Sequence, residues 1–353
     1  MKKKVTAQDI ADKLGLSRNT VSKALNNHPS IAHWTKVTVL REAAQMGYKR
    51  LKLTLPSGGL SPRRTGNIVA VTHEQFVDAS YWSIVSRGAV DALNQAGYDL
   101  IFNYVKQSDE EALAVPQSIA ADHADGLIVL GALRPEYLKA LLEPGLPAVY
   151  VDAALELAAG SGLQRDTVLM ENEQSVYQIT KALIEGGHSR LGFMGDIQFC
   201  RSYHERWCGF RRAHGEKGLE PDLRCCVIDP LPAHYQLLDE VRSRLARFAD
   251  WPTAFVCAND RTAILLIKIL KEKGLRVPGD IAIAGFDDIF EATVVEPHLT
   301  TVRIDKEEIG RRAAEQLLWR LKHPERPLAV IHVATEVIWR DSTAGAVNDR
   351  FLR

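Results

Sequence analysis

Four polar residues near the amino end lie within one short predicted helix and share its outer side: Arg18, Asn19, Ser22 and Lys23. Arginine and lysine donors match the O6 and N7 acceptors of guanine, and an asparagine amide matches N6 and N7 of adenine. These residue types therefore offer hydrogen bonds to base edges in the major groove of DNA. We expect Arg18, Asn19 and Lys23 to make the sequence-specific contacts.

The helices that position these side chains are predicted from capping residues and one turn glycine. Thr6, followed by Asp9 three residues later, is typical of a helix start. Gly15 suits the end of this helix because glycine tolerates the positive φ of the turn, and Ser17 caps the second helix. The apolar residues of the pair are predicted to face inward: Ile10, Leu14, Val21, Ala24 and Leu25.

A third helix completes this unit, with Val37, Leu40 and Ala44 on its inner face and Gly47 as its stop signal. The sequence thus predicts an all-α helix-turn-helix headpiece over residues 1–50. A plain helical hairpin with a basic outer face is the alternative, but it does not require caps, a turn glycine and base-reading residues together. The candidate DNA-binding residues of the headpiece are Thr6, Ser17, Arg18, Asn19, Thr20, Ser22 and Lys23.

The charge of the chain is divided unevenly, although its formal net charge is zero. Residues 1–64 hold thirteen lysines and arginines but three acidic residues, so this segment is +10 and the remainder is −10. Because the basic segment coincides with the predicted headpiece, it indicates a phosphate-binding surface rather than only a solvated face. We expect DNA to repel the acidic remainder.

Residues 51–65 are predicted to form a linker, because Pro56, Gly58, Gly59 and Pro62 oppose regular structure. The same prolines and glycines disfavour a preformed helix. We therefore expect the linker to be disordered in the absence of DNA and to fold in part on binding.

The rest of the chain, residues 66–353, alternates apolar strands with helices, as is typical of parallel strands buried on both faces. The pattern occurs as two series, which predicts an α/β core of two lobes, each a doubly wound parallel sheet. Lobe 1 is expected at about 66–167 plus 297–325, and lobe 2 at about 168–296 plus 326–341. Predicted strands span 67–71, 100–105, 126–130, 148–152, 191–194, 253–258 and 281–284, a further one begins at 168, and helices span 83–96, 174–185, 263–273 and 306–321.

Polar residues follow several of these strands. Asp152, the pair Asn259-Asp260 and the pair Asp287-Asp288 each come directly after an apolar run. Any one of them is explained about as well by a helix N-cap. Several such ends should converge where doubly wound sheets bind ligands, which favours a ligand site between the lobes.

The chain lacks the sequence signatures of several classes of protein. The chain has no G-x-G-x-x-G, P-loop, H-E-x-x-H or G-x-S-x-G motif, so we expect neither an enzyme nor a bound cofactor. Its five cysteines have no metal-ligand spacing, which favours reduced thiols. No apolar run reaches about 18 residues, and polar residues interrupt any secretory signal, so we expect a cytoplasmic protein that does not engage membranes.

Short motifs recur in a specific order along nearly the whole chain, although each is modest alone. They are Asp9-Ile10-Ala11, Ser17, Thr20-Val21-Ser22, Asp125–Ile128, Gly187-His188, Arg206–Phe210, Ala258-Asn259-Asp260, Gly285–Asp288 and Pro297–Val302. In this order they resemble the lactose-repressor/galactose-repressor (LacI/GalR) family of bacterial transcription regulators. The resemblance implies a periplasmic-binding-protein-like core with a small effector between its lobes. It also implies a homodimer or dimer of dimers whose headpieces bind a pseudopalindromic operator in double-stranded DNA.

The same resemblance implies roles for individual core residues. Arg206 and Asp287 fall on effector-contacting positions of the family, and Asp152 and Asn259 fall on positions that sugar-responsive members use. Tyr81-Trp82 follows the first core strand, where the family places pocket aromatics. Two carboxylates, one forked donor and one amide match the hydroxyls of a sugar, so we expect a sugar effector, neutral in preference to phosphorylated.

One segment departs from the family pattern. After the headpiece tyrosine, here Tyr48, members usually have Pro-Asn, then Ala-Arg and a leucine that wedges into the minor groove. This chain has Lys49–Pro56 instead, so Leu53 or Leu55 is the candidate wedge and the hinge mechanism is open.

The leading interpretation is a transcription regulator, a repressor of a sugar-use operon whose operator affinity responds to the sugar. A solute-binding receptor would have the same core, but the basic headpiece opposes that function. An α/β enzyme with a fused DNA-binding module would need a nucleophile and base that the sequence does not display. Fold alone does not separate these functions, because function depends on the site.

Overall fold

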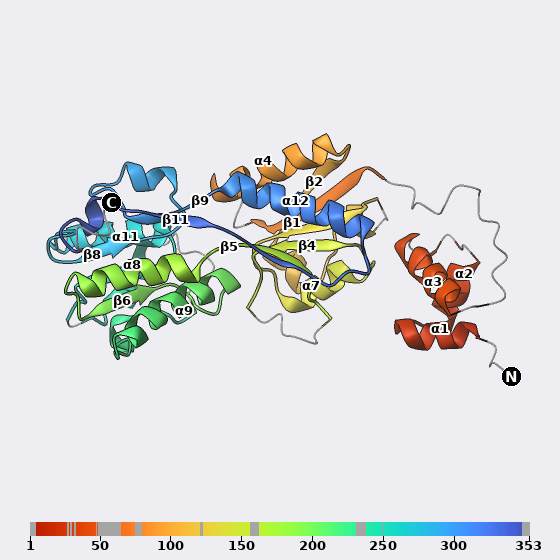
Figure 1. The fold of residues 1–353 in the computed structure, drawn as a ribbon, viewed down its shortest axis with the longest axis horizontal. Coiled ribbons are helices and arrows are strands. Elements are labelled where there is room, and N and C mark those ends of the chain that lie inside the picture. Colours follow the sequence, from red (N-terminus) through yellow and green to blue (C-terminus); the bar gives the residue numbers. More distant parts are fainter. Residues whose placement is uncertain are drawn as a thin grey trace.

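The structure, a computed structural model, describes residues 5–26, 28, 30–31, 33–46, 48, 65–74, 80–120, 123–155, 162–230, 238–248 and 250–347. These residues form a three-helix headpiece and a two-lobed α/β core (Figure 1). The candidate wedge residues Leu53 and Leu55 lie outside the described residues, as does most of the predicted linker. In the described part of the chain, no helix combines the length and apolar composition needed to cross a bilayer.

The headpiece consists of α1 (Ala7–Leu14), α2 (Arg18–Leu25) and α3 (His33–Gln45). The predicted caps are present: the Asp9 carboxylate accepts from the Thr6 backbone N–H at 2.7 Å, and Ser17 Oγ accepts from the Thr20 N–H at 3.0 Å. Gly15 ends α1 at φ +66°, the left-handed conformation that its position required.

The core of the headpiece combines residues of all three helices. Ile10, Val21 and Ala24 are buried as predicted, whereas Leu14 and Leu25 are half-buried. On α3, Val39 and Ala43 are buried and Leu40 is half-buried. The other two residues predicted for its inner face, Val37 and Ala44, lie outside the side chains that the structure describes.

Lobe 1 contains a parallel sheet in the order β10-β5-β4-β3-β1-β2. Because β1 lies between β2 and β3, the chain reverses direction across the sheet at this point, where such folds bind ligands beyond the strand ends. The strands are β1 (Asn67–His73), β2 (Asp99–Val105), β3 (Gly126–Leu130), β4 (Ala148–Val151), β5 (Asp166–Met170) and β10 (Val330–Val333).

Helices cover both faces of this sheet (Figure 1). On one face, α4 (Ser80–Gln95) packs against α12 (Lys306–Lys322) at very close range, since a Cβ added to Gly310 would lie 1.8 Å from the Val85 carbonyl oxygen. The opposite face of the sheet carries α7 (Pro135–Leu142), with the short helices α5 (Gln107–Glu111) and α6 (Gln117–Ala120) also in this lobe.

Lobe 2 contains the parallel sheet β6-β7-β8, made of β6 (Leu191–Met194), β7 (Ala254–Cys257) and β8 (Ala282–Ala284). Its helices are α8 (Glu173–Glu185), α9 (Arg201–Glu216), α10 (Leu238–Leu245) and α11 (Asp260–Glu272). The antiparallel strands β9 (Thr301–Ile304) and β11 (Thr335–Ile338) run between the lobes (Figure 1).

The predicted lobe boundaries require correction. β5 and β10 were assigned by sequence to lobe 2, at least in part, but both belong to the sheet of lobe 1. The reason is the fully buried carboxylate of Asp166, which binds Arg320 of α12 through two hydrogen bonds and accepts from the Ala329 N–H at 2.7 Å. Thr300, assigned by sequence to lobe 1, instead bridges to Ala284 of β8 in lobe 2.

Candidate functional site

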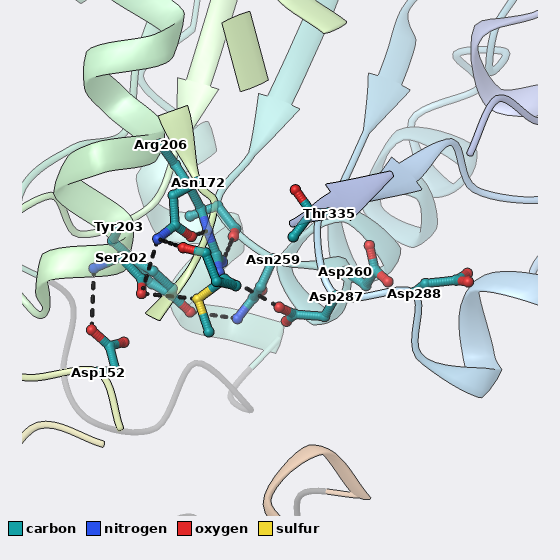
Figure 2. Close-up of polar contacts among 12 residues, drawn as sticks. Asp152, Asn172, Ser202, Tyr203, Arg206, Asn259, Asp260, Asp287, Asp288 and Thr335 are labelled. Atoms are coloured by element: carbon teal, nitrogen blue, oxygen red, sulfur yellow. Dashed lines mark hydrogen bonds and ion pairs between the residues drawn. The ribbon is translucent and has the colours of Figure 1, made fainter. Parts of the chain in front are cut away.

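The predicted effector residues of the core come together from both lobes. Asp152 follows β4 of lobe 1, whereas Arg206 lies on α9 and Asn259 and Asp287 follow β7 and β8 of lobe 2. Figure 2 shows Arg206, Asn259 and Asp287 gathered on one side, with Asp152 approaching from the other lobe. Asp152, Asn259 and Asp287 thus lie beyond the carboxyl ends of strands from both sheets, on the two sides of one polar site.

Asp152 connects the two lobes. Its Oδ1 accepts from the Ala153 N–H at 2.8 Å and from the Ser202 N–H of α9 at 3.2 Å, and the Arg201 N–H donates to the Ala153 carbonyl at 2.9 Å. Asp152 thus caps a helix, but one in the opposite lobe. Burial raises the pKa of this carboxyl, and the hydrogen bonds and Arg206 act in the opposite direction.

Arg206 is the central cation of the site and is almost fully buried. Its Nε donates to Asn172 Oδ1 at 2.9 Å, Nη1 donates to the Ala258 carbonyl, and the guanidinium carbon lies 3.6 Å from the centre of the Phe286 ring. Nη2 lies 3.7 Å from Asp287 Oδ1, which is an ion pair rather than a hydrogen bond. The guanidinium is therefore fixed in place and still able to bind another acceptor.

Asp287 has a strained backbone and a perturbed carboxyl. Its φ is +115° and that of Asp288 is +46°; with Asp152 they are three of the four non-glycine residues with positive φ in the described part of the chain. Such strain concentrates at functional sites. Burial raises the pKa of Asp287 to about 6, although the positive charges of Arg206 and Lys306 oppose this.

The neighbouring Asp288 faces away from the site (Figure 2). Its carboxylate accepts from Arg303 Nε of β9 at 2.8 Å and from Arg340 Nη2 beyond β11 at 2.5 Å. The turn that presents Asp287 is therefore tied to both strands that run between the lobes.

Asn259 is placed in the site, but its amide is already engaged. Its Oδ1 accepts from the Thr262 N–H at 2.9 Å and so caps α11, and its Nδ2 donates to Tyr203 Oη at 2.6 Å. The adjacent Asp260 is fully buried and accepts from Thr301 Oγ1 and the Ile289 N–H, which is a structural role.

The two predicted aromatic residues differ in their surroundings. The hydroxyl of Tyr81 is buried and has no hydrogen-bond partner among the described residues. Burial and the charges of Asp287 and Asp152 raise the pKa of Tyr81, whereas Arg206 lowers it, so this hydroxyl points into the same site. Trp82 packs against the main core, with its ring 5.0 Å from that of Tyr81.

Sequence reasoning missed three polar residues of the site: Asn172, Tyr203 and Lys306. Asn172 follows β5 in the same way that Asp152 follows β4, so the rule for strand ends would have found it. Lys306, whose Nζ donates to the Asp287 carbonyl, is a single lysine at a helix start and has no comparable signal. Among the described residues, no three His, Cys, Asp or Glu side chains are grouped to hold a metal ion, and all five cysteines are free.

The residues predicted to contact DNA lie on α2 and at the starts of α1 and α2. Arg18, Asn19 and Ser22 are exposed on α2, and Lys23 is half-buried. Three other predicted contacts have capping roles: Thr6 caps α1, and the hydroxyls of Ser17 and Thr20 lie 2.8 Å apart at the start of α2.

The core matches a family model described as a periplasmic binding protein-like domain, over residues 180–343. Curated relatives match over nearly the whole chain. The HTH-type transcriptional repressor PurR of Vibrio atlanticus (strain LGP32) is 27% identical over 345 residues, which cover 97% of this chain and 99% of the relative. The repressor of the same name from Photobacterium profundum is 28% identical, with 96% and 98% covered.

Solved structures agree with these matches. A complex of the transcriptional regulator CelR with cellobiose is 26% identical, with a TM-score of 0.70 and coverage of 96% of this chain and 100% of that chain. The lac repressor dimer bound to operator and the anti-inducer ONPF shares the fold, at 20% identity, a TM-score of 0.65 and coverage of 97% and 99%.

The helical headpiece joined to a two-lobed core with a polar site defines a ligand-responsive DNA-binding regulator. The full-length matches support a DNA-binding transcription repressor, and the chain is similar to regulators of the LacI/GalR type. Its relatives are transcription regulators, not enzymes.

Proposed function

We propose that this repressor binds a small neutral sugar between its lobes, and that the sugar sets its affinity for operator DNA. The observation that carries the proposal is the buried hydroxyl of Tyr81, which lies beside Asp152, Arg206 and Asp287 and has no hydrogen-bond partner within the described ranges. A buried hydroxyl without a partner costs about 1–3 kcal/mol. A ligand hydroxyl that hydrogen-bonds to it would recover this free energy.

The donors and acceptors of the site suit a polyol. Arg206 donates only, the ionised carboxylates of Asp152 and Asp287 accept only, and a sugar hydroxyl does both. Neighbouring hydroxyls would bridge Arg206 Nη2 and Asp287 Oδ1, which are 3.7 Å apart. Burial raises the pKa of the carboxyls of Asp152 and Asp287, which means that this site disfavours negative charge. A phosphate group would add further negative charge there, so we propose a neutral sugar rather than a sugar phosphate.

A relative supports the same class of ligand. The CelR structure, at 26% identity, is a complex with cellobiose. We therefore include cellobiose in the test, together with other mono- and disaccharides, their phosphates, purines and amino acids.

Calorimetric screening of these compounds tests the proposal. We expect binding of at least one neutral sugar by the wild-type protein and loss of binding by Asp152→Asn and Arg206→Ala. Asp239→Asn, on the exposed surface of α10, is the matched control and should bind normally. Binding of a purine or an amino acid with no binding of any sugar would refute the sugar assignment.

We also propose that two headpieces, each residues 1–50, bind an inverted repeat through Arg18, Asn19 and Lys23, with residues 51–65 as the linker to the core. One headpiece reads few base pairs, so specificity requires at least a homodimer, with a dimer of dimers as the alternative. Phe290 is 75% exposed and Val294 is 56% exposed in lobe 2, which supports an apolar contact between copies there. Because a repressor must reach the DNA that it regulates, we place the protein in the cytoplasm.

Sedimentation of wild type and Phe290→Asp tests this assembly. We expect the wild type to be a dimer or larger and Phe290→Asp to dissociate. A wild-type monomer bound to one half-site at micromolar concentration would contradict the proposal.

A further inference from the structure

The two residues that precede the first core strand are held by a carboxylate from elsewhere in lobe 1. The Thr65 N–H donates to Asp125 Oδ1 at 2.9 Å, and the Gly66 N–H donates to Asp125 Oδ2 at 3.0 Å. Both oxygens of one carboxylate therefore bind successive amides of the main chain. Hydrogen bonds to an ionised acceptor are roughly twice as strong as those between neutral groups.

Further hydrogen bonds close this corner of the lobe. The Asp99 N–H donates to the Gly66 carbonyl at 2.7 Å, and the Asp125 N–H donates to the Asn67 carbonyl at 2.8 Å. Asn67 Nδ2 donates to the His123 carbonyl at 3.1 Å. The chain is thus bound to the starts of both β2 and β3 before β1 begins.

The carboxylate is not needed to hold β1 in the sheet. β1 pairs with β2 from Asn67 to His73 and with β3 from Ile68 to Thr72, and its central residues are fully buried. The carboxylate of Asp125 binds upstream of these ladders, at the amides of Thr65 and Gly66. This is where the segment from the headpiece enters the core.

We propose that Asp125 is a positioning residue that anchors the DNA-binding headpiece to lobe 1 and transmits movement of that lobe to the headpiece. A fixed entry point keeps the second headpiece at a high effective concentration near its half-site. A fixed entry point also makes the linker move when lobe 1 rotates, whereas a loose entry point would let the lobe rotate without moving the linker. The transmission step rests on the effector response proposed above.

Asp125→Asn is the direct perturbation. An asparagine side chain accepts through one oxygen only, and its amide group faces an N–H donor, so one anchoring bond is lost and the corner loosens. We expect faster hydrogen exchange of the Thr65 and Gly66 amides and unchanged exchange of Val69 and Val71. Affinity for a genomic DNA fragment selected by the wild type should fall about tenfold.

Regulation should weaken in the same variant. Allosteric coupling is typically about 5–150-fold. We expect the ratio of DNA affinities without and with cellobiose, or with the sugar found by calorimetry, to fall below about threefold. Affinity for that sugar in the absence of DNA should stay within about twofold of wild type.

Thr65→Pro tests the same bond from its other end, because proline has no N–H. Thr65→Ala is the matched control, since it keeps the N–H and loses only Oγ1, which accepts from the Asn67 N–H at 3.2 Å. We expect Thr65→Pro to resemble Asp125→Asn in DNA affinity, and Thr65→Ala to resemble wild type. The double variant Asp125→Asn/Thr65→Pro should lose no more DNA affinity than either of its single variants.

Three results would overturn the anchor: wild-type DNA affinity in Asp125→Asn and Thr65→Pro, unchanged exchange at Thr65 and Gly66, or a loss of sugar affinity that indicates a wider role in folding. A wild-type protein that responds to none of the compounds refutes the proposed effector instead. In that case DNA affinity and hydrogen exchange still decide the role of Asp125.

Discussion

Replacement of Arg206 by alanine should destabilise the core and abolish the response to effector. Arg206 is buried and binds Asn172 Oδ1 and the Ala258 carbonyl, packs on Phe286, and lies 3.7 Å from the Asp287 carboxylate. Its removal leaves two acceptors without a donor and a partly buried carboxylate without its nearest cation.

The magnitude follows from these contacts. An acceptor left buried without a donor costs about 1–3 kcal/mol, and removing one member of a buried ion pair costs about 3–5 kcal/mol. These contributions share one side chain and do not add, so we expect a loss of about 3–5 kcal/mol. Because domains of this kind are stable by only about 5–15 kcal/mol, the variant core should remain folded but marginally so. Effector-free DNA binding should persist below its unfolding transition.

Urea unfolding followed by tryptophan fluorescence measures this loss, with calorimetry for sugar binding and anisotropy for DNA binding. Arg206→Lys retains the charge but not the fork, and it should be intermediate. Arg224→Ala is the control, because Arg224 is 90% exposed and its one ion pair among the described residues is with the nearby Asp222. This variant should behave as wild type. An Arg206→Ala core within about 1 kcal/mol of wild type, or one that still binds sugar, would refute the reasoning.

Three other predictions follow from individual residues. Tyr81→Phe removes the buried hydroxyl that has no partner among the described residues, so urea unfolding should show equal or greater stability. Calorimetry should show that the affinity for the sugar is reduced about tenfold, and an unchanged affinity would contradict a ligand contact. The pKa of Asp287 is raised to about 6 in the folded protein, whereas the same carboxyl in the unfolded chain releases its proton near pH 4. The contribution of Asp287 to the free energy of unfolding therefore falls as the pH rises from about 4 to 6. Urea titrations should show that Asp287→Asn removes this slope, and a constant difference from wild type across the range would refute it. Gly310→Ala should destabilise the core by about 1–3 kcal/mol in urea unfolding, because the added Cβ would meet the Val85 carbonyl. In the control Gly215→Ala, on α9, the added Cβ meets no atom, so this variant should be neutral or stabilising.

Local signals predicted much of this molecule. The caps at Thr6 and Ser17 depend on residues three positions apart, so a short stretch of sequence contains the whole interaction. The strand-end positions of Asp152, Asn259 and Asp287 follow from apolar runs that a parallel sheet must bury. The lobe architecture follows from the same alternation of strands and helices.

Long-range contacts explain what sequence could not predict. The buried pair of Asp166 and Arg320 joins residues 154 positions apart and draws β5 and β10 into lobe 1. Asp152 caps a helix of the other lobe, and no pattern near residue 152 indicates that partner.

Some predictions remain to be tested. The minor-groove role of Leu53 or Leu55 concerns residues outside the described ranges, and comparison of Leu53→Ala with Leu55→Ala on DNA bending would test it. If neither variant changes affinity or bending, the family's hinge mechanism does not apply to this chain.

Selection of genomic DNA fragments by the purified protein, followed by sequencing, tests the central claim most directly. We predict that recovered fragments share an inverted repeat with half-sites about one helical turn apart. Arg18→Ala, Asn19→Ala and Lys23→Ala should each lose affinity for that repeat while keeping their affinity for random DNA. Recovery of fragments without a shared repeat, or equal losses on the repeat and on random DNA, would contradict the assignment of this chain as a sequence-specific repressor that reads DNA through α2.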